Sequence, residues 1–130
     1  WSSCNTMASD YNWGSNASIS ERIKICAIVD YFKGDSTYES SVRDMISFML
    51  GRNWSGYSFV TGYGSKTPEN PHHRQSMAAG TAVPGMLVGG FVESYYIDSA
   101  DDYTTNEICI YWNSSAMWAF AYVVEQDLKN

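Results

Sequence analysis

Residues 71–74 place three chemistry-bearing side chains directly next to one another. They contain both of the chain's histidines, His72 and His73, followed directly by Arg74. Arginine presents a rigid fork of donors and histidine can both donate and accept, so this group suits a ligand rich in hydroxyl or anionic oxygens. Pro71 stiffens the backbone that leads into it. Adjacent histidines usually cannot both reach one zinc ion, and we therefore predict no metal and no cofactor.

Glu107 is a second candidate, because it lies where a polar stretch gives way to an apolar one at Ile108. A carboxyl group at such a boundary is partly withdrawn from water, which favours its protonated form and suits a general acid. A solvated glutamate at the start of a helix is the alternative. The nearby Asp98, Asp101 and Asp102 could form a calcium loop, a charge cluster or ordinary loop polarity, and loop polarity is the default.

Composition narrows the class of partner. The 130 residues carry a formal charge of −6, which argues against nucleic acid, since a phosphate backbone requires clustered lysine and arginine. No apolar run is long enough to cross a membrane. Five tryptophans and ten tyrosines suit a surface that stacks flat neutral ligands, or they belong to the core. The first ten residues lack the layout of an export signal, and we expect them to follow a cut within a longer chain.

Two helices are expected in the first half of the chain. Apolar residues recur at helical spacing over residues 15–32 and again over residues 36–50. Ser36 and Glu39 have the spacing of a capping box for the second helix. The short connection predicts an antiparallel helical hairpin. The helical period returns over residues 113–128, which gives a last helix.

The stretch between these helices has no helical period. Glycine, proline, serine and asparagine punctuate residues 52–93, and so long a loop in a domain is usually functional or disordered. Its apolar clusters, which include Phe59, Val60, Met86 and Leu87, predict an ordered loop. The sequence therefore indicates an all-α fold with functional loops at one end of its helices, part of a helical barrel. So few helices cannot close a barrel, so the chain is expected to be a piece.

Three asparagines, Asn16, Asn53 and Asn113, each open an N-x-Ser sequence. Glycosylation is one interpretation. Capping of helices is the better one, with Ser15 or Asn16 at the start of the first helix.

The three cysteines lack the spacing of metal ligands. Their odd number prevents complete pairing within the chain. Cys26 and Cys109 lie among apolar residues, so we expect both to be buried free thiols, whereas Cys4 has no such setting.

Two long segments resemble the signature segments of glycoside hydrolase family 9, the endoglucanases and related cellulases. They are SFVTGYGSKTPENPHHR at residues 58–74 and YIDSADDYTTNEICIYWNS at residues 96–114. WGSN at 13–16 and VPGMLVGG at 83–90 follow the family order. The resemblance implies an (α/α)6 barrel that hydrolyses β-1,4-glucan with inversion and is secreted. Residues 1–130 would be the C-terminal portion of one catalytic domain, with the upstream remainder expected as a partner.

The resemblance also implies roles for individual side chains. Glu107 would be the general acid that protonates the departing glycosidic oxygen, Asp98 would organise the site through hydrogen bonds, and His72 would bind the sugar beside the cleaved bond. Trp13 would stack on a sugar ring and Tyr103 would support it. Sugar-binding side chains implied in this way are Arg74, His73, Trp13 and Tyr103.

Inverting hydrolysis needs a second carboxylate about 6.5–9.5 Å from the acid. The resemblance implies that it lies upstream, so Asp98 and Asp101 are not assigned to this role and the isolated chain is expected to be inactive. A non-catalytic glucan-binding remnant and a fragment that needs an upstream segment are the alternatives. Cys109, Trp112 and Phe91 depart from the family pattern, which has serine, threonine or alanine, tyrosine, and proline there. An open barrel would also expose apolar faces such as Met45, Met49 and Phe120.

Overall fold

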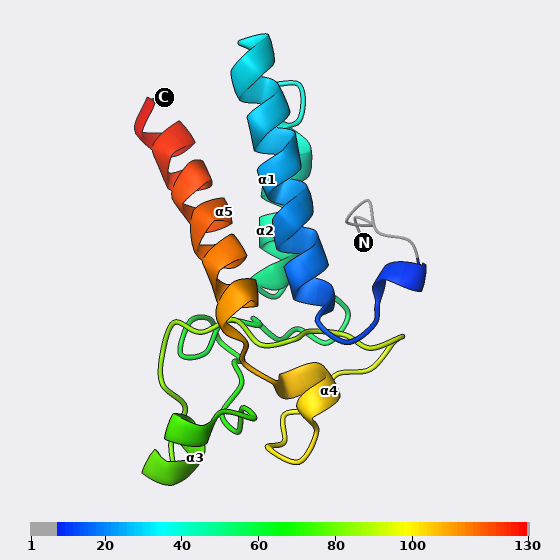
Figure 1. Ribbon diagram of the computed structural model, residues 1–130, viewed down its shortest axis with the longest axis vertical. Coiled ribbons are helices and arrows are strands. Elements are labelled where there is room, and N and C mark those ends of the chain that lie inside the picture. The colour runs from blue at the N-terminus through cyan, green and yellow to red at the C-terminus, as the bar shows by residue number, and fades with distance from the viewer. Residues whose placement is uncertain (1–7, 130) are drawn as a thin grey trace.

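The computed structural model describes residues 8–129, and within this range it contains helices and loops but no strand (Figure 1). Three long helices stand side by side above a layer of loops. The elements are a 3-10 helix η1 and five α-helices: η1 Ala8–Asp10, α1 Ser15–Lys33, α2 Glu39–Met49, α3 Arg74–Ala79, α4 Tyr103–Asn106 and α5 Ile110–Lys129. The predicted helices at 15–32, 36–50 and 113–128 are confirmed, with shifts of up to three residues at their ends.

The helices α1 and α2 form the predicted antiparallel hairpin (Figure 1). Gly34 ends α1 in the left-handed conformation, with φ of 68°. The capping box predicted for α2 is wrong, because its N-cap is Tyr38 and no side chain of its own caps it. The buried carboxylate of Asp30 in α1 accepts hydrogen bonds from the Tyr38 N–H at 3.0 and 3.1 Å. A tertiary contact therefore replaces the local cap.

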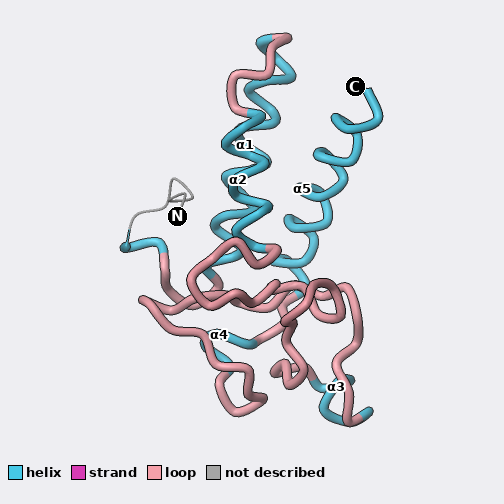
Figure 2. Tube along the Cα trace, turned by 180° about the vertical axis from the view of Figure 1, so that it is seen from behind, coloured by secondary structure: helices cyan, strands magenta, loops and turns pink. Residues whose placement is uncertain are grey.

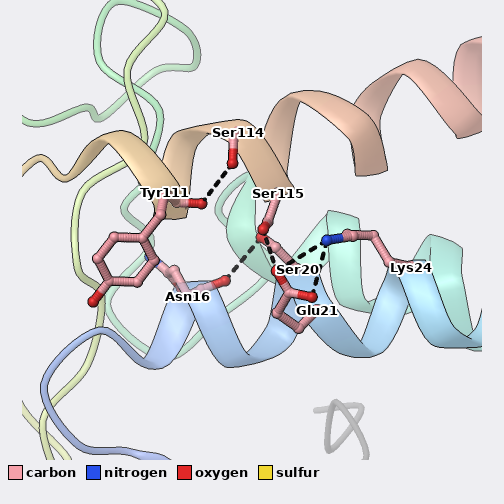
Figure 3. Close-up of polar contacts among 7 residues, drawn as sticks. All are labelled: Asn16, Ser20, Glu21, Lys24, Tyr111, Ser114 and Ser115. Atoms are coloured by element: carbon pink, nitrogen blue, oxygen red, sulfur yellow. Dashed lines mark hydrogen bonds and ion pairs between the residues drawn. The ribbon is translucent and has the colours of Figure 1, made fainter.

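The helix α5 packs on α1 along a small-residue face. Its buried residues Trp112, Ser115, Ala116 and Ala119 recur at helical spacing. Figure 3 shows Ser115 pointing at Glu21 of α1, and the hydroxyl donates a hydrogen bond to the Glu21 carboxylate, which also pairs with Lys24 at 3.0 Å. The Ser115 hydrogen bond, followed by Lys24, lowers the pKa of Glu21 below its ordinary value of 4.5.

The apolar core fills the space between the three long helices and the loop layer. Met45 and Met49 of α2 are 2% and 0% exposed, so the expectation that they lack partners within this chain is wrong. Phe59 and Leu87 from the long loop are also buried there, at 0% and 1% exposed. The ordered, packed loop predicted over residues 52–93 is therefore confirmed.

The loop layer is held together by isolated β-bridges, and Figure 2 shows it beneath the helices. Val60 pairs with Leu87, Val88 with Ile108, and His72 with Glu107. Segments far apart in the sequence are thereby brought to the end of the helices where α1 and α5 begin and α2 ends (Figure 1).

The capping roles predicted for the three asparagines are wrong. Gly14 is the N-cap of α1, and Ser15 and Asn16 are already inside the helix. The Asn16 amide donates to the Val88 carbonyl at 2.9 Å. Asn53 holds the turn after α2 through the N–H groups of residues 55 and 56, at 3.0 and 3.1 Å. Asn113, within α5, bonds both the N–H and the carbonyl of residue 87 at 2.7 and 3.0 Å. All three side chains fasten loops.

Cys26 and Cys109 are free thiols, as predicted, but both are half-buried instead of buried. Burial raises the pKa of the Cys26 thiol. Cys4 lies outside the described residues. No helix in residues 8–129 combines the length and apolar character needed to cross a membrane.

Candidate active site

The backbone pairing of His72 with Glu107 is the basis of the site. The His72 N–H donates to the carbonyl of Asn106 at 2.8 Å, and the Ile108 N–H donates to the His72 carbonyl at 3.4 Å. These bonds join the loop before α3 to the segment between α4 and α5. Two of the predicted site residues, 35 positions apart in sequence, thus become neighbours.

The carboxyl group of Glu107 is half-buried at the C-terminal end of α4, where its backbone is extended with φ of −70° and ψ of 145°. Glu107 thus ends α4 and does not lie at the start of a helix, as the alternative assumed. Trp13, in the turn before α1, donates its indole N–H to Oε2 of Glu107 at 3.0 Å. Because an indole N–H can only donate, this oxygen must act as an acceptor.

Aromatic rings connect Trp13 to His72. Tyr103 lies edge to face with Trp13 at 5.5 Å between ring centres and with His72 at 6.1 Å. The Nδ1 atom of His72 lies 2.5 Å from the carbonyl oxygen of Ala100. A carbonyl only accepts, so Nδ1 carries a proton and donates it to Ala100, which fixes the orientation of the ring.

Asp98 supports this arrangement from the side of the preceding loop. Its carboxylate accepts hydrogen bonds from the N–H groups of Glu69 and Asn70 at 2.8 and 2.9 Å, and from the Asn106 amide at 3.1 Å. These contacts hold the backbone immediately before Pro71. They are of the organising kind that the resemblance implies for Asp98, whose role in the reaction stays a prediction.

Asn106 is a supporting residue that sequence reasoning missed. It is fully buried, and its amide also donates to the Asn70 carbonyl at 2.7 Å. Tyr96 donates its phenol hydrogen to Asn106 Oδ1 at 2.5 Å. Burial, followed by the charge of Asp98, raises the pKa of Tyr96 well above its ordinary value, so the phenol stays protonated. An isolated asparagine before a glutamate carries no sequence signal for this role.

A groove of about 900 Å³ opens beside these residues. Its polar wall includes His72, His73, Arg74 and Glu107. Its apolar wall comes from the long loop and from α5, and includes Leu87 and Phe120. His73 is the N-cap of α3, and its Nδ1 lies 2.9 Å from the Ser76 hydroxyl. Arg74 is exposed and has no ion pair within residues 8–129. Its guanidinium is thus free to meet a ligand.

Asp101 and Asp102 are ordinary polar residues of the loop that leads into α4. Asp102 is the N-cap of α4 and accepts from the N–H of Thr105 at 3.3 Å and the hydroxyl of Thr104 at 2.5 Å. Asp101 is exposed. Within the described part of the chain, no three histidine, cysteine, aspartate or glutamate side chains are grouped so that they could hold a metal ion.

A carboxyl group, imidazoles and a guanidinium around one groove, carried on loops that connect helices, form a candidate active site at one end of a helical fold. Comparison with known proteins defines the class further. The chain matches the family model for glycosyl hydrolase family 9 over residues 2–120, and it belongs to that family. The fold is part of an (α/α)6 barrel, as predicted from the resemblance.

Curated relatives include endoglucanase D of Acetivibrio thermocellus, which is 37% identical over 120 residues, covering 89% of this chain and 19% of the relative. A cellulose 1,4-β-cellobiosidase of the same organism is 33% identical, with 91% and 16% covered. Among solved structures, a thermostable endoglucanase of Alicyclobacillus acidocaldarius has a TM-score of 0.86 at 30% identity, with 92% of this chain and 26% of that chain covered. The chain thus spans a quarter or less of most of these relatives.

Proposed function

We propose that this chain is the C-terminal portion of a catalytic domain that hydrolyses β-1,4-glucosidic bonds in cellulose or a related β-glucan with inversion. The observation that carries the proposal is the half-buried Glu107 carboxyl group, which shares one groove with His72 and Arg74. Membership of a family whose relatives are named endoglucanase and cellobiosidase supports the substrate class.

Glu107 acts as the general acid in this proposal. Its Oε2 accepts the Trp13 N–H, so the acidic proton of the neutral carboxyl group lies on Oε1. That proton passes to the glycosidic oxygen as the bond to the leaving sugar breaks. His72, His73 and Arg74 bind sugar hydroxyls, because imidazole and guanidinium groups offer donors at fixed angles.

Trp13 and Tyr103 complete the sugar-binding surface. Trp13 is 55% exposed and Tyr103 49%, so each retains an open ring face despite their mutual contact. An aromatic face suits the apolar face of a glucose ring. Asp98 and Asn106 hold the loops that carry these groups and are assigned no contact with the substrate.

A second carboxylate must activate the attacking water, and we assign it to an upstream segment of the domain. Asp98 is unsuited to this role, because its oxygens are occupied by the backbone N–H groups of Glu69 and Asn70. The 130 residues alone are therefore expected to bind glucan without cleaving it. An extracellular location follows from an insoluble polymeric substrate and is part of the proposal.

The test uses the full-length protein that carries this chain, with carboxymethylcellulose as the substrate. Glu107→Gln keeps the side chain's size and removes the acid, and is expected to lower the release of reducing ends by about 100- to 10,000-fold. Glu125→Gln is the matched control, since Glu125 is exposed and pairs only with Lys129 on the surface of α5. Full activity of Glu107→Gln would disprove the assignment. Binding of cellohexaose by the unmodified protein without any cleavage would favour the glucan-binding remnant.

A further inference from the structure

Trp112 of α5 is buried directly against Gly14, the N-cap of α1. Gly14 lies in the left-handed region with φ of 82°, and a β-carbon built on it would lie 2.7 Å from Cζ2 and 2.9 Å from Cε2 of Trp112. Both the backbone conformation and the available space therefore require glycine. Trp112 is only 5% exposed, so its ring has a fixed place in the packing.

Several contacts surround this turn. The Ser15 N–H donates to the Asn12 carbonyl at 3.0 Å across Trp13 and Gly14, the Tyr103 ring lies beside Trp13, and Trp112 is the side chain that packs against Gly14 itself. The Asn16 N–H donates to the Gly89 carbonyl at 3.0 Å, and the Asn16 amide donates to the Val88 carbonyl at 2.9 Å. These bonds begin two residues after Gly14. Trp13 itself extends away from the helix towards Glu107, where its side chain makes the 3.0 Å hydrogen bond.

We propose that Trp112 is a positioning residue for Glu107 that acts through Gly14 and Trp13. The inference rests on the proposed function, in which Glu107 is the general acid. The Trp112 ring fixes the position of the Trp13–Gly14 backbone. That position determines whether the Trp13 indole N–H reaches Oε2 of Glu107. The hydrogen bond in turn keeps Oε2 as the acceptor and Oε1 as the oxygen that carries the proton.

The consequence for the reaction follows from the sensitivity of proton transfer to geometry. Misplacement of a reacting group by about 1 Å can cost about 100-fold in rate. Removal of the Trp112 ring leaves a void next to Gly14, so the backbone of Trp13 can shift into it. The Trp13 indole N–H then no longer holds the Glu107 carboxyl group. The loss falls on the step that protonates the leaving group.

The experiment compares two substrates in the full-length enzyme. Cellotetraose releases a sugar that must be protonated as it leaves, whereas a dinitrophenyl cellobioside releases a phenolate that needs no proton. Trp112→Ala is expected to lower kcat on cellotetraose by about 10- to 100-fold with little change in KM, and to leave kcat on the aryl substrate within about 3-fold of the unmodified enzyme. Trp112→Phe retains a ring and is expected to recover most of the loss.

Trp13→Phe tests the same link without touching the buried Trp112 ring, since it removes the indole N–H and keeps a smaller aromatic face. It is expected to show the same dependence on the leaving group. Both substitutions break the same hydrogen bond, from Trp13 to Glu107. The double variant Trp13→Phe/Trp112→Ala should therefore lose no more activity than the more impaired single variant. If Trp112→Ala fails to fold, Trp112→Leu, which keeps an apolar side chain but removes the ring, replaces it in this cycle.

Equal losses on both substrates, or losses that multiply in the double variant, would overturn the inference. Glu107→Gln measured on the same two substrates separates this failure from a failure of the proposed function. If the loss of kcat in Glu107→Gln depends on the leaving group and the loss in the Trp112 variants does not, only the positioning role is wrong. If Glu107→Gln loses activity equally on both substrates, Glu107 is not the general acid.

Discussion

Asn106 shows how one buried side chain can connect the groups around a reactive carboxyl group. Its amide donates to the Asp98 carboxylate and the Asn70 carbonyl, and accepts the Tyr96 phenol hydrogen. Its own carbonyl receives the His72 N–H. The backbone immediately before Pro71 is therefore tied, directly and through Asp98, to the residue next to Glu107.

Replacing Asn106 by aspartate is expected to destabilise the full-length protein by at least about 2 kcal/mol, because it removes the amide donors and places a second carboxylate beside Asp98. Thermal unfolding monitored by circular dichroism measures the effect. Asn12→Asp is the control, since Asn12 is exposed and its side chain makes a long hydrogen bond of 3.4 Å to the Ser9 carbonyl. An Asn106→Asp variant that unfolds at the temperature of this control would contradict the role.

Asp98→Ala is expected to cost about 1.5–3 kcal/mol of stability, because hydrogen bonds to a charged group are lost from the Glu69 and Asn70 N–H groups. Activity should fall with it, since these bonds hold the backbone before His72. Chemical denaturation and the rate on carboxymethylcellulose measure the two effects. An active, equally stable variant would show that the loop needs no such anchor.

At the scale of elements, the contact between α1 and α5 depends on a polar pair. Ser115 donates to Glu21, and this bond lowers the pKa of the glutamate. A carboxyl group whose pKa is lower in the folded state stabilises the fold above its unfolded pKa, and the contribution disappears as the pH falls through the folded value.

Ser115→Ala is therefore expected to lower the unfolding temperature of the full-length protein at pH 7, with a difference from the unmodified protein that shrinks at pH values well below 4.5. Ser114→Ala is the matched control, because the Ser114 hydroxyl only bonds the Tyr111 carbonyl of its own helix (Figure 3). A Ser115→Ala difference that stays constant between pH 3 and pH 7 would contradict the role of ionised Glu21.

The long helices could be predicted from sequence because their apolar residues repeat over many turns, but their caps could not. The cap of α2 comes from Asp30 and that of α1 from Gly14, so the capping box at Ser36 and the asparagine caps were wrong. Similarly, the His72–Glu107 bridge and the Trp13–Glu107 hydrogen bond join residues 35 and 94 positions apart, beyond the reach of periodicity. Residue types and setting single out His72, His73, Arg74 and Glu107, and the family resemblance implies their roles. Asn106 and the contact of Trp112 required the structure.

On the scale of the whole chain, apolar side chains remain exposed along the outer faces of α1 and α5. On α1 they are Ile25, Ile28 and Phe32, at 61%, 45% and 81% exposed. On α5, Ile110, Met117 and Val124 recur every seven residues and are 58–89% exposed. The surfaces that an incomplete barrel leaves open are therefore these outer faces of α1 and α5. Met45 and Met49 are not part of them, because both methionines are buried within the chain.

The isolated 130-residue chain is expected to self-associate, because apolar patches of several hundred Å² drive association. Size-exclusion chromatography with light scattering measures this. Ile28→Glu/Phe32→Glu should shift the distribution towards monomer, whereas Ser18→Glu at another exposed position of the same helix should not. A stable monomer of the unmodified chain at micromolar concentration would show that these faces need no cover.

A structure of the full-length Glu107→Gln variant with bound cellotetraose tests the central claim most directly. We expect the side-chain amide of residue 107 to lie about 2.6–3.2 Å from a glycosidic oxygen, with His72 and Arg74 in contact with hydroxyls of the adjoining sugar. A glucan chain that occupies the groove with no glycosidic oxygen within reach of residue 107, or that binds away from His72 and Arg74, would contradict the account.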